Sequence, residues 1–92
     1  MRIRRTQPAA GDLTNIYKYI GAHDSPTTAR RVALMIYRSV TLLEKFPHRG
    51  RKGRKTDTRE LVIASMPYVV IYRVRDNMVE VVRILHGAQD WP

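Results

Sequence analysis

Cysteine is absent from the 92 residues of this sequence, and its absence excludes several kinds of chemistry at once. Without thiols the chain has no disulfide framework, no thiolate zinc site and no cysteine nucleophile. The three histidines are not accompanied by clustered carboxylates at ligand spacing, so they make no metal site. We therefore expect neither a bound metal nor any other cofactor.

Long apolar runs are also missing. The longest, at residues 61–64 and 69–72, fall far short of the roughly 20 apolar residues that a membrane-spanning helix needs. The N-terminus is basic, but no apolar stretch follows it, which argues against a secretory signal. These two absences favour a cytoplasmic protein without membrane contacts.

Acidic residues are few, because eight Asp and Glu stand against 17 Lys and Arg, a formal net charge of +9. Such a chain attracts polyanions such as nucleic acid, the ribosome or an acidic protein surface. Hydrophobic residues make up 43% of the sequence, which is enough for a core, and no repeat or linker interrupts it. We expect a single domain over residues 1–92.

Apolar residues recur at helical spacing in two stretches of the first half. The first stretch follows Pro8 and is expected to stop at Gly21; its apolar stripe consists of Leu13, Ile16, Tyr17 and Ile20. The second begins after Ser25 and is expected to hold one face for about five turns to Phe46, where Pro47 ends it. Two amphipathic helices joined by a short loop pack as an antiparallel hairpin.

The second half of the chain is expected to form strands. Residues 48–55 carry five cations and two glycines and are interpreted as a loop. Strands are predicted at residues 58–65, 68–75 and 78–86, with turns at 66–67 and 76–77, and residues 1–6 weakly favour another strand. The pattern predicts a small α+β fold in the order β-α-α-β-β-β, with an N-terminal strand, an antiparallel helical hairpin and a three-stranded antiparallel meander.

The last two predicted strands are largely apolar on both faces, which suggests that both faces are covered. The helical hairpin can cover one of them. The other face is expected to need a partner, the C-terminal tail, or both.

Several stretches resemble the ParE-type toxins of the RelE/ParE superfamily, in the expected order along nearly the whole chain. They are residues 10–13, 16–20, 29–31, 43–47, 50–51, 58–61, 68–74 (YVVIYRV) and 81–89 (VVRILHGAQ). The resemblance implies that family's fold and the toxin half of a type II toxin–antitoxin pair. It also implies a cognate antitoxin whose acidic, partly disordered segment wraps the toxin, and the positive charge fits such a partner.

Within the superfamily, RelE-like members cut messenger RNA on the ribosome, whereas ParE-like members are linked to poisoning of DNA gyrase. Metal-free RNA cleavage needs a base, an acid and cations that stabilise the phosphorane. By the resemblance, the RelE catalytic arginines fall on Ala64 and on or beside Gln89, and no tyrosine follows Tyr72. These departures favour a ParE-like toxin that inhibits gyrase by protein binding and has no conventional active site.

The alternative is a ribosome-dependent messenger RNA endonuclease similar to YoeB-like enzymes. His86 would then act as base or acid, and Arg59, Arg73 and Arg83 would clamp phosphate. A histidine near a strand end is more often a hydrogen-bonded structural residue. A third hypothesis is a toxin fold whose main task is plasmid or operon maintenance, with a weak cellular target.

These hypotheses define two sets of candidate contact residues. For the target or nucleic acid they are Arg49, Arg51, Lys52, Arg54, Lys55, Arg73, Arg83, His86, Gln89 and Trp91. For the antitoxin they are the apolar residues Leu34, Met35, Leu42, Val69, Ile71, Val82 and Ile84. Arg73 and Arg83 are expected either to align as a cationic patch on neighbouring strands or to pair with glutamates. The glutamates in question are Glu60 and Glu80.

Overall fold

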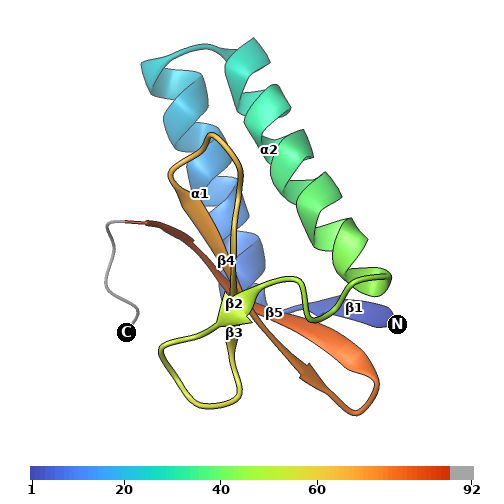
Figure 1. The fold of residues 1–92 in the computed structure, drawn as a ribbon. Helices are drawn as coiled ribbons and strands as arrows, with labels where there is room; N and C mark the ends of the chain where they lie inside the picture. The colour runs from blue at the N-terminus through green and yellow to red at the C-terminus, as the bar shows by residue number, and fades with distance from the viewer. Residues whose placement is uncertain (88–92) are drawn as a thin grey trace.

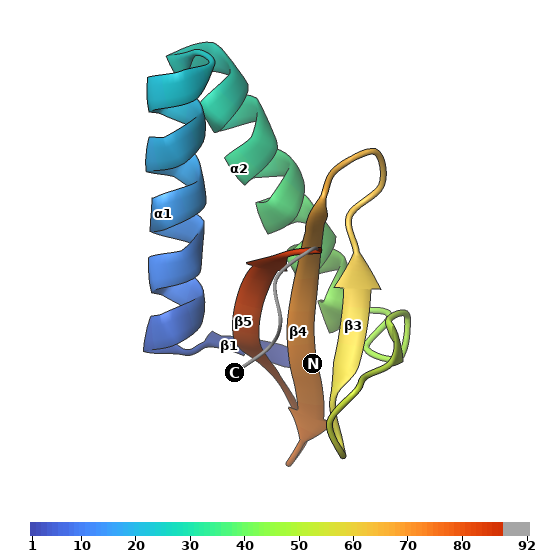
Figure 2. The ribbon, with the colours of Figure 1, turned by 90° about the vertical axis from the view of Figure 1, so that its left-hand side faces the viewer.

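Two helices lie on one side of a five-stranded sheet (Figures 1 and 2). The structure is a computed structural model that describes residues 1–87. Its elements are β1 (Arg2–Arg5), α1 (Gln7–His23), α2 (Pro26–Thr41), the 3₁₀ turn η1 (Leu42–Glu44), β2 (Arg51–Lys52), β3 (Arg59–Val62), β4 (Tyr68–Arg75) and β5 (Met78–His86). The predicted α+β fold and the order of its elements are confirmed, with β2 as an additional strand.

Both helices begin at capped prolines, as the sequence predicts. The side chain of Thr6 accepts a hydrogen bond from the Ala9 backbone N–H, and that of Ser25 accepts one from Thr28. Each oxygen satisfies one of the backbone donors that a helix leaves unpaired at its start. Neither helix is long and apolar enough to cross a membrane, as far as residues 1–87 are concerned.

The predicted stop of α1 at Gly21 is wrong, because the helix continues to His23. A glycine inside a helix costs only about 1 kcal/mol relative to alanine, and the intrahelical hydrogen bonds continue past it, ending with Asp24 N–H to Ile20 C=O. A Cβ atom at Gly21 would lie 3.9 Å from the Cβ of Ala29, so the glycine sits where α1 approaches α2.

The predicted extent of α2 to Phe46 is also wrong. The α-helix ends at Thr41, and η1 follows it as a tighter turn. A 3₁₀ turn has 3.0 residues per turn instead of 3.6, so the apolar stripe does not continue in register. Leu43 is fully buried, whereas the side chain of Phe46 is 57% exposed.

The sheet has the strand order β1-β5-β4-β3-β2, with β1 parallel to β5 and all other neighbours antiparallel. The β4–β5 turn is the predicted one, because Asp76 and Asn77 both have positive φ, as a two-residue type I′ hairpin requires. The predicted first strand of the meander is shorter, Arg59–Val62 instead of 58–65.

The interpretation of residues 48–55 as a loop without a strand is wrong at two positions. Arg51 pairs with Glu60 and Lys52 pairs with Arg59 in the short antiparallel strand β2. Two residues are too few to produce an alternation in the sequence, so this edge strand had no detectable pattern.

The core lies between the helical hairpin and one face of the sheet. Fully or almost fully buried side chains come from α2 and η1 (Ile36, Val40, Leu43) and from the sheet (Val70, Tyr72, Val79, Val81). Because successive side chains of a strand alternate between faces, Ile71 and Arg73 of β4 belong to the opposite face, which we call the outer face.

The outer face is apolar along only half of β4 and β5, so the expectation of two apolar faces is met in part. Val69 pairs with Leu85 there, whereas Arg73 pairs with Glu80 farther along the same strands. Ile84, predicted for the antitoxin contact, instead belongs to the core on the helix side and is 6% exposed.

The free edge of β5 is closed by the start of α1. β1 pairs with only the first half of β5, and Thr6 extends this pairing by donating to the carbonyls of Val81 and Val82. Beyond it, the Asp12 carboxylate accepts the backbone N–H of Ile84 at 2.9 Å. The side chain of Asp12 therefore satisfies an edge donor that would otherwise lack a strand partner.

Candidate functional site

The basic segment 48–55 is held against the sheet by the buried hydroxyl of Tyr72. This oxygen accepts the Gly50 N–H at 2.8 Å and donates to the Pro47 carbonyl at 2.8 Å. A Cβ atom at Gly50 would lie 2.7 Å from the Tyr72 ring, so only glycine fits there without displacement. Burial raises the pKa of Tyr72, which outweighs the lowering by the Gly50 hydrogen bond and the nearby arginines.

Glu60 organises the next part of this segment. Its side chain is 6% exposed, and its oxygens accept from the Arg51 guanidinium at 3.0 Å and from the Arg54 backbone N–H at 3.1 Å. Burial alone would raise the pKa of Glu60, but these hydrogen bonds and the two guanidinium charges lower it below its ordinary value. Glu60 therefore neutralises part of the charge that Arg51 and Arg54 bring to the surface.

Two more arginines that we predicted as contact residues are bound to carboxylates. Arg73 is bound to Glu80 at 2.6 Å, and Glu80 also accepts from Arg4 at 3.1 Å. Arg83 forms two hydrogen bonds to Asp12, at 2.7 and 2.9 Å, and these bonds raise the pKa of Arg83. The pairing alternative thus holds for Arg73, but the partner of Arg83 is an aspartate on α1 and not a glutamate of the sheet.

Four of the arginines that we predicted as contact residues have carboxylate partners, and we call these four the anchored arginines. They are Arg51, Arg54, Arg73 and Arg83. Sequence reasoning missed the role of Asp12, because 71 residues separate it from Arg83 and no local pattern links the two.

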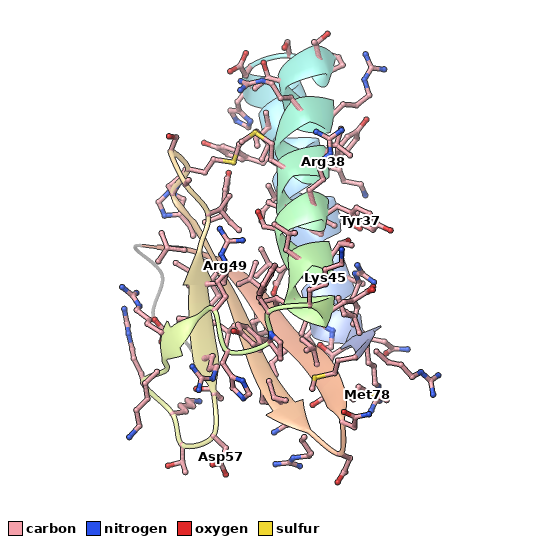
Figure 3. The ribbon with its side chains drawn as sticks, turned by 45° about the vertical axis from the view of Figure 1, so that its right-hand side comes forward. Tyr37, Arg38, Lys45, Arg49, Asp57 and Met78 are labelled. Atoms are coloured by element: carbon pink, nitrogen blue, oxygen red, sulfur yellow. The ribbon has the colours of Figure 1, made fainter. Side chains whose placement is uncertain are left out.

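A cavity of about 570 Å³ lies at the end of the sheet that carries the β4–β5 turn and the loop after β2. We call it the basin; its lining residues are His48, Lys52, Asp57, Thr58, Arg59, Arg73, Val74 and Arg75. Arg59 donates to the carbonyls of His48 and Gly50, which orients the guanidinium without neutralising it. In Figure 3, Asp57 marks the loop beside the basin, far from the helical hairpin's tip.

Three basin cations have no carboxylate partner within residues 1–87. They are Lys52, Arg59 and Arg75, since each ion pair found there involves other cations. Sequence reasoning found Lys52 and Arg59 but missed Arg75. A signal for it existed, because Arg75 follows Arg73 at the two-residue spacing of a strand face.

The four residues of the nuclease hypothesis are not brought together. Arg59 and Arg73 line the basin, whereas His86 lies opposite Tyr68 at the other end of β4, with ring centroids 5.9 Å apart. Arg59 pairs with Tyr72, four residues along β4 from Tyr68, which corresponds to about 13 Å at the usual rise of a strand. Arg83 is held by Asp12.

Exposed apolar side chains gather on the helices and after η1. They include Tyr17, Tyr19, Leu34, Tyr37, Leu42 and Phe46. A second cavity, of about 620 Å³, lies beside the last two and is lined by Leu42, Lys45, Phe46, Pro47, His48 and Arg49. Figure 3 shows Tyr37, Arg38 and Lys45 projecting along one side of the α2–η1 region.

The remaining predicted contact residues fall into three groups. Arg49 and Lys55 are exposed, and Met35, Val69 and Val82 are half-buried. Ile71 is on the outer face but is only 4% exposed. Gln89 and Trp91 lie outside the described residues.

Comparison with known proteins gives consistent results. Residues 3–91 match the family described as the ParE toxin of the type II toxin–antitoxin system parDE. Y4kP, a candidate toxin of Sinorhizobium fredii, is 42% identical over 91 residues, covering 99% of this chain and 93% of the relative. The toxin RelE2 of Caulobacter vibrioides is 44% identical over 84 residues, covering 91% of this chain and 92% of that protein.

A solved structure shares the fold. The chain superposes on a chain of the chromosomal ParDE toxin–antitoxin system from P. aeruginosa with a TM-score of 0.87 and 25% sequence identity. The match covers 94% of this chain and 95% of the other.

Proposed function

Because this chain belongs to the ParE toxin family of type II toxin–antitoxin systems, we propose that it arrests growth by binding DNA gyrase and that a cognate antitoxin neutralises it. The proposal assigns inhibition to protein–protein contact and not to cleavage of a substrate. Both partners would be met in the cytoplasm.

The observation that carries the proposal is the separation of the residues that a nuclease would need. General acid–base cleavage requires a base, an acid and charge-stabilising cations within hydrogen-bond reach of one phosphate. His86 lies about 13 Å from Arg59 along the sheet, by the rise of a strand, and Arg83 is committed to Asp12. This arrangement supports binding over catalysis.

Antitoxin contact is best supported on the helical hairpin. Leu34 is 47% exposed and Leu42 is 43% exposed, which is unusual for large apolar side chains gathered on one part of a small protein. An acidic segment that covered them would also meet Arg30 and Arg31, which lie on α2 together with Leu34. Apolar anchors with charge complementarity suit a segment that folds on binding.

Target contact is best supported on the exposed cations of segment 48–55. Arg49 and Lys55 are exposed, and the Tyr72 hydroxyl and Glu60 hold the backbone between them in place. A positioned basic segment loses less conformational entropy on binding than a free one, which favours affinity for an acidic or DNA-containing target.

The test is supercoiling of relaxed plasmid by purified gyrase, with increasing amounts of the chain. We expect supercoiling to fall and linear DNA to accumulate. The variant Arg49→Gln/Lys55→Gln should inhibit less than Arg30→Gln/Arg31→Gln, which removes the same charge from α2. Undisturbed supercoiling at large excess of the chain would refute the gyrase proposal.

The endonuclease hypothesis predicts a different outcome. Messenger RNA would be cut on purified ribosomes by the unmodified chain, and His86→Ala would abolish this cleavage while antitoxin binding stayed unchanged. We expect no such cleavage.

Antitoxin cover is testable by limited proteolysis with trypsin. The free chain should be cut within residues 48–55, which offer five basic cleavage sites. If the antitoxin covers only the helical hairpin, these sites stay sensitive in the complex. Protection of the segment would place the antitoxin over the basic surface as well.

A further inference from the structure

We propose that the basin binds the phosphate backbone of duplex DNA. The inference concerns a surface at one end of the sheet and does not depend on gyrase being the target. It rests on the arrangement of the cations, their lack of carboxylate partners and the near absence of apolar side chains.

The cations of the basin come from neighbouring strands at one end of the sheet. Lys52 of β2 lies directly opposite Arg59 of β3, and Arg59 pairs with Tyr72, so these two cations belong to the face of the sheet that carries Tyr72. Arg73 and Arg75 belong to the outer face, and residues of both pairs line the basin. A smaller hollow of about 200 Å³ adjoins the basin, because it shares Arg75 with the basin and reaches Arg4 of β1. Cations from both faces therefore gather around this end of the sheet.

The charge available to a ligand comes from three of these residues. Arg73 and Arg4 share Glu80, so their charges are partly cancelled. Lys52, Arg59 and Arg75 have no carboxylate partner within residues 1–87, and the lining includes one acidic residue, Asp57. Arg59 is also positioned in advance, because its guanidinium donates to two backbone carbonyls. Its remaining donors suit the oxygens of a phosphate.

The chemistry of the lining favours a nucleic acid over an acidic peptide. Among the described residues that line the basin, Val74 is the one aliphatic residue. A peptide that folds on binding needs apolar anchors, because its charges alone do not offset the ordering entropy. Phosphate binding needs no such anchors, since release of condensed counterions supplies the free energy. Exposed large apolar residues are found outside the lining, mainly on the helices, at Phe46 and at Val62 of β3.

The experiment measures binding of the full chain to a labelled DNA duplex of arbitrary sequence by fluorescence anisotropy over a series of salt concentrations. Lys52→Gln/Arg75→Gln removes two basin charges without touching the Arg59 hydrogen bonds. Arg30→Gln/Arg31→Gln removes two exposed charges from α2 and is the matched control. We expect the basin variant to flatten the slope of log K against log salt by about 1.8 and to weaken binding by tenfold or more at about 0.1 M salt. The control should change binding less than about threefold.

The result that overturns the proposal is an equal loss in both double variants, which would show attraction by net charge only, or no duplex binding by the unmodified chain. Lys52→Arg should retain binding; failure of this conservative variant would also count against a charge-based contact. Two further probes define the ligand. Tighter binding of single-stranded RNA with the same number of phosphates would exclude the duplex, and equally tight, equally basin-dependent binding of polyglutamate would assign the surface to an acidic protein.

Gyrase is absent from this measurement, so the two proposals fail independently. A chain that binds duplex through the basin and leaves supercoiling unaffected supports the basin and refutes the gyrase proposal. If the chain inhibits gyrase, the inhibition is insensitive to Lys52→Gln/Arg75→Gln and the chain does not bind free duplex, the gyrase proposal is supported and the basin proposal is refuted.

Discussion

The cations of the sheet and of segment 48–55 include two populations with different surroundings. The anchored arginines, Arg51, Arg54, Arg73 and Arg83, each lie against a carboxylate that is at most 15% exposed, whereas Lys52, Arg59 and Arg75 meet none within residues 1–87. An anchored arginine contributes to the fold and offers reduced charge to a ligand, while an unpaired one adds self-repulsion and a usable field. The two populations are neighbours in sequence, so a charge count along the chain does not separate structural from binding residues.

The largest effect on stability is expected at Asp12, because its carboxylate binds both an anchored arginine and a backbone N–H at the edge of β5. Asp12→Ala removes both hydrogen bonds to Arg83 and leaves the Ile84 N–H without its acceptor. We expect the free energy of unfolding to fall by about 2–4 kcal/mol. Urea unfolding followed by circular dichroism measures this loss. Glu44→Ala, a change at an exposed carboxylate outside every ion pair described, should cost less than about 0.5 kcal/mol.

The second effect concerns the attachment of the basic segment. Tyr72→Phe deletes the hydroxyl that bonds Gly50 and Pro47, and it leaves the Gly50 N–H buried without an acceptor. The expected cost is about 1–3 kcal/mol. Faster tryptic cleavage within residues 48–55 should accompany it. Tyr37→Phe, at a half-exposed position on α2, is the control. Equal stability of Tyr72→Phe and the unmodified chain would mean that the hydroxyl does not hold the segment.

The third effect is a pH dependence of stability that arises from Glu60, the carboxylate partner of two anchored arginines. Because the pKa of Glu60 is lower in the folded chain than its unfolded value of about 4.3, its contribution to stability is present above that value. The contribution is lost as the pH falls through the lower, folded pKa. Thermal unfolding between about pH 6 and pH 3 should show a smaller loss of stability in Glu60→Gln than in the unmodified chain. Parallel pH profiles for the two proteins would contradict this assignment.

The smallest effect on stability is expected in the basin itself. Lys52→Gln/Arg75→Gln should change the free energy of unfolding by less than about 0.5 kcal/mol, because neither side chain has an ion pair to lose among residues 1–87. The same variant is expected to have the largest effect on binding to duplex DNA. Urea unfolding measures this change. A decrease in the free energy of unfolding above about 1 kcal/mol would show that these cations are structural and would contradict the distinction between the two populations.

The elements with long and regular patterns were predictable from the sequence. The bounds of β4 and β5 agree with the predicted strands, and the type I′ turn at Asp76-Asn77 follows from residue types that tolerate positive φ. The errors lie where the pattern is short or weakly punctuated. Gly21 did not end α1, because a helix continues through a glycine when packing favours it, and β2 was too short to recognise.

The candidate site was predictable only as a collection of residue types. The basic segment, Arg59 and Arg73 could be chosen from charge and strand position, and the resemblance to ParE toxins supplied the family that the comparisons confirm. The sequence could not place His86 and Arg59 four residues apart along β4, opposite Tyr68 and Tyr72, because that separation depends on strand register. The core position of Ile84 was also not predictable from the sequence. It depends on the register shift between Ile71 and Tyr72, which changes the pairing of β4 with β5 next to Ile84.

By itself the sequence determined the type and order of the long helices and strands, the excess of positive charge and the family, because local spacing and residue identity encode all three. Only the tertiary structure decided which cations are neutralised. Asp12 reaches Arg83 across 71 positions, and Glu80 joins Arg73 to Arg4 across the sheet. Ion pairing depends on distances of a few ångströms between residues remote in the chain, and the register of strands and the docking of α1 on β5 set those distances.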